Sequence, residues 1–166
     1  MIMQTKQLFL SAIIAVVLLV SPNSSSAQFV NGKIYLGPHF AVGYYGGGLS
    51  LGANIEGAIT QPGSAGPGRI ALAGRFDISF YTGGNLLLFS GLANYHYSVA
   101  EDKLDLFGGL GISFFTFSNS YYAGASQIFP AIDLGARYFI NSAMALRFML
   151  GVLYYPYLTF GVDWAL

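Results

Sequence analysis

Apolar residues alternate with small or polar residues along the chain from residue 34 onward, in segments of about 9 to 14 residues. An alternation with a period of two places successive side chains on opposite faces of a β-strand. Turn-forming residues separate the segments. Pro38 and Pro130 fall inside segments, where a missing N–H predicts a local departure from regular pairing. The pattern predicts eight strands, at 34–45, 48–60, 69–81, 86–99, 104–117, 127–140, 144–155 and 158–166.

The ionisable residues inside these segments share one face. Bulky apolar residues mark the other face, as Leu146, Phe148 and Leu150 do in the segment 144–155. An Arg or Lys at mid-depth on the lipid face of a membrane barrel costs about 2–4 kcal/mol. The pattern therefore predicts an apolar exterior facing lipid and a lumen holding a structural polar network. Its members are Glu56, Arg69, Arg75, Asp77, Asp105, Asp133, Arg137, Arg147 and Asp163.

The remaining lumen positions are occupied by small or polar residues. They include Gly37, His39, Ala41 and Gly43, then Ser50, Gly52 and Asn54, and further along Gly109, Gly111 and Ser113. An eight-stranded barrel is narrow enough for side chains to fill. We therefore expect a filled lumen and not an open pore.

Aromatic residues gather near the ends of the predicted strands. Two belts of aromatic side chains at the membrane interfaces are typical of transmembrane barrels. We expect one belt to contain Tyr44, Phe80, Tyr81, Tyr154 and Tyr157, and the other Tyr35, Tyr95, Tyr97, Tyr138 and Trp164.

The composition agrees with a membrane barrel. Only 8% of the residues are charged, against about 25% in soluble domains. After the first 27 residues, no run of 18 uncharged apolar residues exists to form a spanning helix. A closed barrel is the other structure that satisfies its backbone in lipid. The net charge is +0 and no basic patch stands out, so nucleic acid is not expected as a partner.

The first residues have the pattern of a signal peptide. Lys6 precedes an apolar run from Leu8 to Val20, and Ser25 and Ala27 form the small-x-small pattern of a processing site. We expect a signal peptide at 1–27, cleavage before Gln28, and an outer-membrane barrel domain at 28–166. An uncleaved membrane anchor is the alternative, although the apolar run is short for a spanning helix.

Two stretches carry a resemblance to a known family. They are Leu106-Phe107-Gly108-Gly109-Leu110-Gly111-Ile112 and Leu134-Gly135-Ala136-Arg137-Tyr138-Phe139. With the alternation, the chain resembles the small eight-stranded outer-membrane β-barrels of the OmpA/OmpX type, within the porin-like family. The resemblance implies an all-β, antiparallel, up-and-down transmembrane barrel in the bacterial outer membrane with periplasmic termini. It also implies outer-membrane lipids and, during biogenesis, the barrel-assembly machinery as partners.

Two alternatives to a non-enzymatic barrel remain. His96-Tyr97-Ser98 resembles the His-x-Ser of outer-membrane lipid A deacylases, in which His activates Ser for ester hydrolysis. The second alternative is a secreted soluble barrel of the lipocalin type, which needs an apolar lumen and a polar exterior. We expect no catalytic residues, no cofactor and no metal site; His39 has no ligand at metal spacing nearby. Any small ligand is left open.

Overall fold

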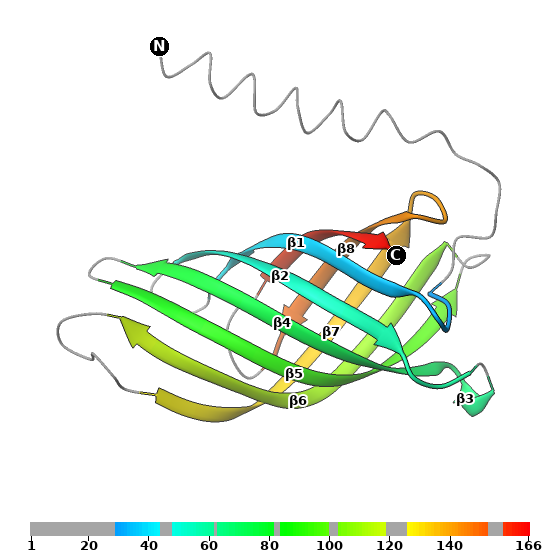
Figure 1. Cartoon of the computed structure of the whole chain (residues 1–166), viewed down its shortest axis with the longest axis horizontal. Coiled ribbons are helices and arrows are strands. Elements are labelled where there is room, and N and C mark those ends of the chain that lie inside the picture. Colours follow the sequence, from blue (N-terminus) through cyan, green and yellow to red (C-terminus); the bar gives the residue numbers. More distant parts are fainter. Residues whose placement is uncertain are drawn as a thin grey trace, which may run out of the picture.

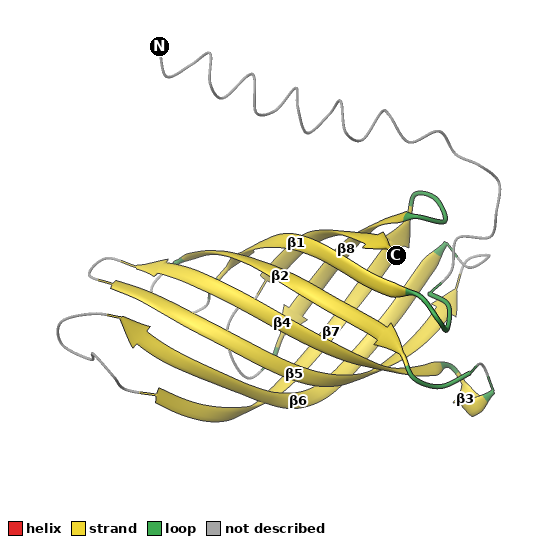
Figure 2. Ribbon diagram, in the orientation of Figure 1, coloured by secondary structure: helices red, strands yellow, loops and turns green. Residues whose placement is uncertain are grey.

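The structure, a computed structural model, describes residues 29–43, 48–61, 63–81, 84–99, 103–118, 126–152 and 158–166. In this part of the chain Figure 2 shows only strands and connecting loops. No helix in these ranges is long and apolar enough to cross a membrane. The strands are β1 (Ile34–Val42), β2 (Leu49–Ala58), β3 (Ser64–Pro67), β4 (Arg69–Tyr81), β5 (Gly84–Val99), β6 (Leu104–Ser118), β7 (Ser126–Phe139), β8 (Met144–Gly151) and β9 (Leu158–Ala165).

Eight strands form a closed antiparallel barrel in the order β1-β2-β4-β5-β6-β7-β8-β9 (Figure 1). The short strand β3 lies in the connection between β2 and β4. It stands at the end of the barrel where β1 begins and β9 ends, which we call the terminal end; the opposite end is the loop end. The predicted eight-stranded up-and-down barrel is thus confirmed, with strand bounds that agree to within a few residues. The predicted strand residues 44–45 and 153–155 lie outside the described residues.

The alternation of the sequence becomes an alternation of exposure. Along β1 every second residue is buried in the lumen and every other one is exposed on the outside. Large apolar side chains such as Leu110 and Ile112 on β6 are therefore exposed to about two thirds, at 66% and 64%. A surface of this kind is stable in a hydrocarbon environment and unfavourable in water.

The two prolines lie within strands without shifting the register. Pro38 stands opposite Ala53 of β2, and Pro130 stands opposite Ile112 of β6, in ladders that continue with the same register on both sides. The ladder that closes the ring, between β1 and β9, is paired at Leu36 and again at His39, with no pairing at the two residues between them. Proline has no N–H to donate, so we attribute this gap to Pro38.

The interior differs from the predicted one at both ends of the barrel. Near the loop end it is apolar, because Leu86, Leu88 and Phe115 are buried together. The run Leu86-Leu87-Leu88-Phe89 contains bulky residues on both faces, so the rule that bulky residues face lipid does not hold there. At the terminal end, Tyr35 is 1% exposed and lies in the lumen. Its predicted place in an aromatic belt was wrong, since it shares the parity of the inward-facing His39.

Candidate functional site

The charged residues predicted for the lumen lie inside the barrel. Eight of them are buried: Glu56, Arg75, Asp77, Asp105, Asp133, Arg137, Arg147 and Asp163. Arg69, at the start of β4, is partly buried. The ion pairs sort these residues into two groups. The terminal cluster consists of Glu56, Asn94, His96, Asp105, Arg137 and Asp163, and the central cluster of His39, Arg75, Asp77 and Asp133.

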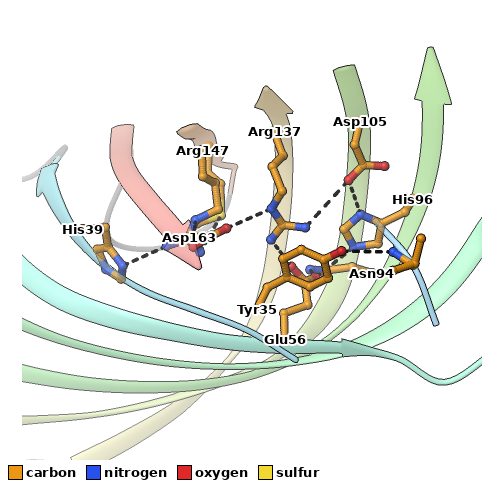
Figure 3. Close-up of polar contacts among 11 residues, drawn as sticks. Tyr35, His39, Glu56, Asn94, His96, Asp105, Arg137, Arg147 and Asp163 are labelled. Atoms are coloured by element: carbon orange, nitrogen blue, oxygen red, sulfur yellow. Dashed lines mark hydrogen bonds and ion pairs between the residues drawn. The ribbon is translucent and has the colours of Figure 1, made fainter. Parts of the chain in front are cut away.

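Arg137 on β7 is the centre of the terminal cluster. Its Nε donates to Asp163 Oδ2 on β9 at 2.9 Å, and its Nη2 donates to Glu56 Oε2 on β2 at 2.5 Å. Its Nη1 lies 3.8 Å from Asp105 Oδ2 on β6. Figure 3 shows the guanidinium between these acids, which approach it from different strands. A fully buried cation is stable only when such partners compensate for its lost hydration. Because the acids stand on β2, β6 and β9, Arg137 also links strands that are not all neighbours of β7 in the ring.

His96 on β5 bridges two of the same acids. Its Nδ1 lies 2.6 Å from Asp105 Oδ2 and its Nε2 lies 2.9 Å from Glu56 Oε1. An ionised carboxylate only accepts hydrogen bonds, so both ring nitrogens donate when the ring carries two protons. Asn94 on the same strand donates from Nδ2 to Glu56 Oε1 at 2.5 Å. The terminal cluster therefore places Arg137 and His96 in direct contact with three acids.

The central cluster is organised around Asp77 on β4. His39 Nε2 lies 2.6 Å from Asp77 Oδ1, and Arg75 Nε donates to Asp77 Oδ2 at 3.0 Å. Arg75 also donates from Nη1 to Asp133 Oδ2 on β7 at 3.1 Å. Arg147 on β8 joins the two clusters, since its Nη2 lies 3.3 Å from His39 Nδ1 and its Nε lies 3.4 Å from Asp163 Oδ1.

The two clusters and Arg147 form one connected network to which every strand of the barrel contributes at least one residue. Arg69 stands beside His96 in the β4–β5 ladder, and its buried Nε has no hydrogen-bond partner among the described residues. The structure thus brings eight of the nine predicted charges into contact and leaves Arg69 at the edge.

Interior glycines give the network its space. A Cβ at Gly52 on β2 would collide with the His39 ring and with the carbonyl oxygen of Phe76, and would lie 2.8 Å from Asp77 Oδ1. Gly52 is one of the small residues expected to fill the lumen. The position requires glycine, because the hydrogen bond between His39 and Asp77 occupies the space that a Cβ would take.

Sequence reasoning missed two aromatic residues of the terminal cluster. Phe29, ahead of β1, is fully buried, and its ring stacks on His96 with centroids 4.0 Å apart. The Cζ atom of Arg137 lies 5.0 Å from the centroid of the Phe29 ring and 5.1 Å from that of Tyr35, distances at which a guanidinium is attracted to a ring face. The parity of β1 was sufficient to place Tyr35 inside. No periodic signal marks Phe29, which lies outside the strands.

The geometry bears directly on the chemistry proposed for His96 and Ser98. Both ring nitrogens of His96 face carboxylate oxygens. A general base for a serine nucleophile needs one nitrogen directed at the hydroxyl. Among the described residues, no group of three or more His, Asp or Glu side chains is arranged to hold a metal ion. The arrangement is suited to cross-linking strands by charge.

Comparison with known proteins gives similarity in structure alone. No family model matches the sequence, and no curated protein matches it. The N-terminal β-barrel domain of OprF from Pseudomonas aeruginosa aligns with a TM-score of 0.61 and 15% identity, over 82% of this chain and 98% of that one. A de novo designed transmembrane β-barrel aligns with a TM-score of 0.56 and 16% identity, over 84% and 99%. The fold is that of an eight-stranded transmembrane β-barrel. The exterior fits it, and a lipocalin-like barrel with a polar outside does not describe this chain.

Proposed function

We propose that this chain is a non-enzymatic integral protein of the bacterial outer membrane with a structural role in the envelope. The observation that carries the proposal is the contrast between its two surfaces. The large exposed apolar residues lie on all eight barrel strands, while the strand carboxylates and guanidinium groups are inside. In lipid, an apolar exterior is favourable, and ionised side chains are tolerated only where the barrel encloses them.

The network supports a lumen that is filled and not conducting. Glu56, Arg137 and Asp163 come from three strands and meet in the interior, with His96 and Asp105 against them. An ion crossing the barrel would have to break these contacts and leave buried charges without partners, which is strongly unfavourable. A barrel of this kind stabilises its own fold and does not serve as a diffusion channel.

We further propose that the chain reaches the outer membrane through the secretion pathway, with a signal peptide at 1–27 removed before Gln28. Its partners are then the outer-membrane lipids and, during insertion, the barrel-assembly machinery. Sequencing the N-terminus of the mature protein tests the processing site, and a first residue other than Gln28 would place the cleavage elsewhere.

The test of the main proposal has two parts. Envelope fractionation followed by electrophoresis of boiled and unboiled samples should give a heat-modifiable band in the outer membrane. The purified barrel in planar lipid bilayers should give no conductance steps above the lipid background. Recovery in the soluble fraction contradicts the membrane proposal, and regular channel openings contradict the filled lumen.

A further inference from the structure

Phe29 lies in the lead before β1 and enters the barrel at its terminal end. Its side chain is fully buried, at 0% exposure. The ring is stacked on His96 at an interplanar angle of 11° and on Tyr35 with centroids 4.7 Å apart. The backbone next to it is held as well, because Val30 N donates to the Tyr35 hydroxyl at 3.1 Å. A residue outside the strands is thus packed among groups of the lumen.

The surroundings of Phe29 are built by the barrel and not by the lead itself. Ala71 on β4 and Ala145 on β8 are small residues buried in the same cluster as the ring, together with Phe139. The His96 ring is oriented by its two carboxylate partners and the Arg137 guanidinium by its acids. The receiving surface is therefore fixed by contacts that do not involve Phe29.

We infer that the terminal end of the lumen contains a binding site for one aromatic ring, and that Phe29 is its occupant and closes the interior there. We call this site the ring slot; it consists of Tyr35, Ala71, His96, Arg137, Phe139 and Ala145. Flat stacking on an imidazole and the approach of a guanidinium both require a π-system. An aliphatic side chain makes neither interaction and is therefore not held in the site in the same way.

The ring slot defines a class of ligand. If the side chain of Phe29 is removed, the site becomes a preformed cavity with an apolar floor and a cationic wall, and such cavities bind small neutral molecules of matching shape. Because the site also favours a π-system, phenol should bind, and cyclohexanol, which is of similar size but has no π-system, should not. This inference deepens the proposal of a filled lumen and rests on it, because it names what fills the lumen at the terminal end.

The absence of cysteine from the sequence allows a direct test. Ala71→Cys places a single thiol in the ring slot, and modification by a charged, water-soluble methanethiosulfonate reagent reports whether the slot is open. In detergent-folded protein that shows the heat-modifiable band, we expect slow modification with Phe29 present and modification at least tenfold faster with Phe29→Ala. Phenol should slow the reaction of the Phe29→Ala barrel, and cyclohexanol should not.

Two control variants distinguish opening of the ring slot from a general loosening of the barrel. Ala41→Cys lies in the lumen near the loop end and should react equally slowly with and without Phe29→Ala. Val30→Ala keeps the N–H that bonds Tyr35 and should leave the thiol of the Ala71→Cys barrel protected. If Phe29→Ala does not fold, Phe29→Tyr and Phe29→Leu replace it, with protection expected for Tyr and rapid modification for Leu.

The inference is overturned if the Ala71→Cys thiol is modified at the same rate with and without the Phe29 ring. It is also overturned if phenol and cyclohexanol protect the thiol equally, or if Tyr and Leu at position 29 do so. The experiment is done in detergent on folded protein. Its failure would therefore leave the membrane location untouched, whereas a soluble protein in cell fractionation would contradict the location without opening the slot.

Discussion

Arg147 Nη2 lies 3.3 Å from His39 Nδ1, and this contact joins the terminal and central clusters into one network. The two residues stand on β8 and β1, which flank β9 in the ring. A guanidinium only donates hydrogen bonds, so Nδ1 of His39 accepts and Nε2 carries the hydrogen that it donates to Asp77. His39 thus links Asp77 to Arg147, whereas His96 lies between two carboxylates.

Removing the Arg137 guanidinium from the terminal cluster should destabilise the barrel strongly. Arg137→Leu leaves Glu56 and Asp163 buried without their main partner, and breaking a buried ion pair in this way costs about 3–5 kcal/mol. The measurement is urea unfolding of the barrel in lipid vesicles, followed by electrophoretic mobility. Arg69→Leu is the matched control, since Arg69 makes none of the ion pairs within the described residues.

Neutralising the acids should recover part of that loss. Adding Glu56→Gln and Asp163→Asn to Arg137→Leu replaces unpaired charges by neutral amides, whose burial costs less. A triple variant no more stable than Arg137→Leu would show that packing, and not charge, accounts for the effect of Arg137.

If His96 has a structural role, substitutions at His96 and Ser98 should differ in their effect on the unfolding free energy. His96→Gln removes a bridge between Glu56 and Asp105 and should lower the unfolding free energy by about 2–3 kcal/mol. Ser98→Ala should change it by no more than about 0.5 kcal/mol. Neither substitution should alter the acylation of lipid A in the envelope, measured by mass spectrometry. Loss of an ester-hydrolysing activity in both variants would favour the enzymatic alternative.

A single methyl group at an interior glycine should be costly. Gly52→Ala forces the His39 ring away from Asp77 and should destabilise the barrel by about 1–3 kcal/mol. The control is Gly91→Ala, because a Cβ at Gly91 meets nothing within 4 Å among the described residues. Thermal unfolding monitored by mobility on gels compares the two. Equal midpoints would mean that the interior adjusts to the added volume.

Depth in the membrane should determine the effect of a charge on the outer face. Ile112 lies near the middle of β6 and is 64% exposed, while Ile34 is the first residue of β1 and is 47% exposed. Ile112→Arg should cost about 2–4 kcal/mol in lipid vesicles, and Ile34→Arg about 0–1 kcal/mol. Equal effects at the two positions would contradict the placement of β6 across the bilayer.

Much of this fold is predictable from parity alone, and the network is not. The inward position of Glu56 and Arg137 follows from their place in the alternation. That these two residues contact each other does not follow, because they stand on β2 and β7 and meet only across the lumen. The alternation also fails where apolar residues run together, as at Leu86 and Leu88, and it says nothing of Phe29, which has no strand to give it a phase.

The gap at Pro38 has a consequence for how the ring holds together. The joint between β1 and β9 links the first and last strands of the barrel, the pair farthest apart along the chain, and it lacks backbone pairing at two positions. Closing the ring between such distant segments costs loop-closure entropy, so we expect local opening to begin at this joint. His39 and Arg147 reach over it from β1 and β8. The contact between these two side chains in the lumen thus holds β1 and β8 together across the joint where the backbone pairing is interrupted.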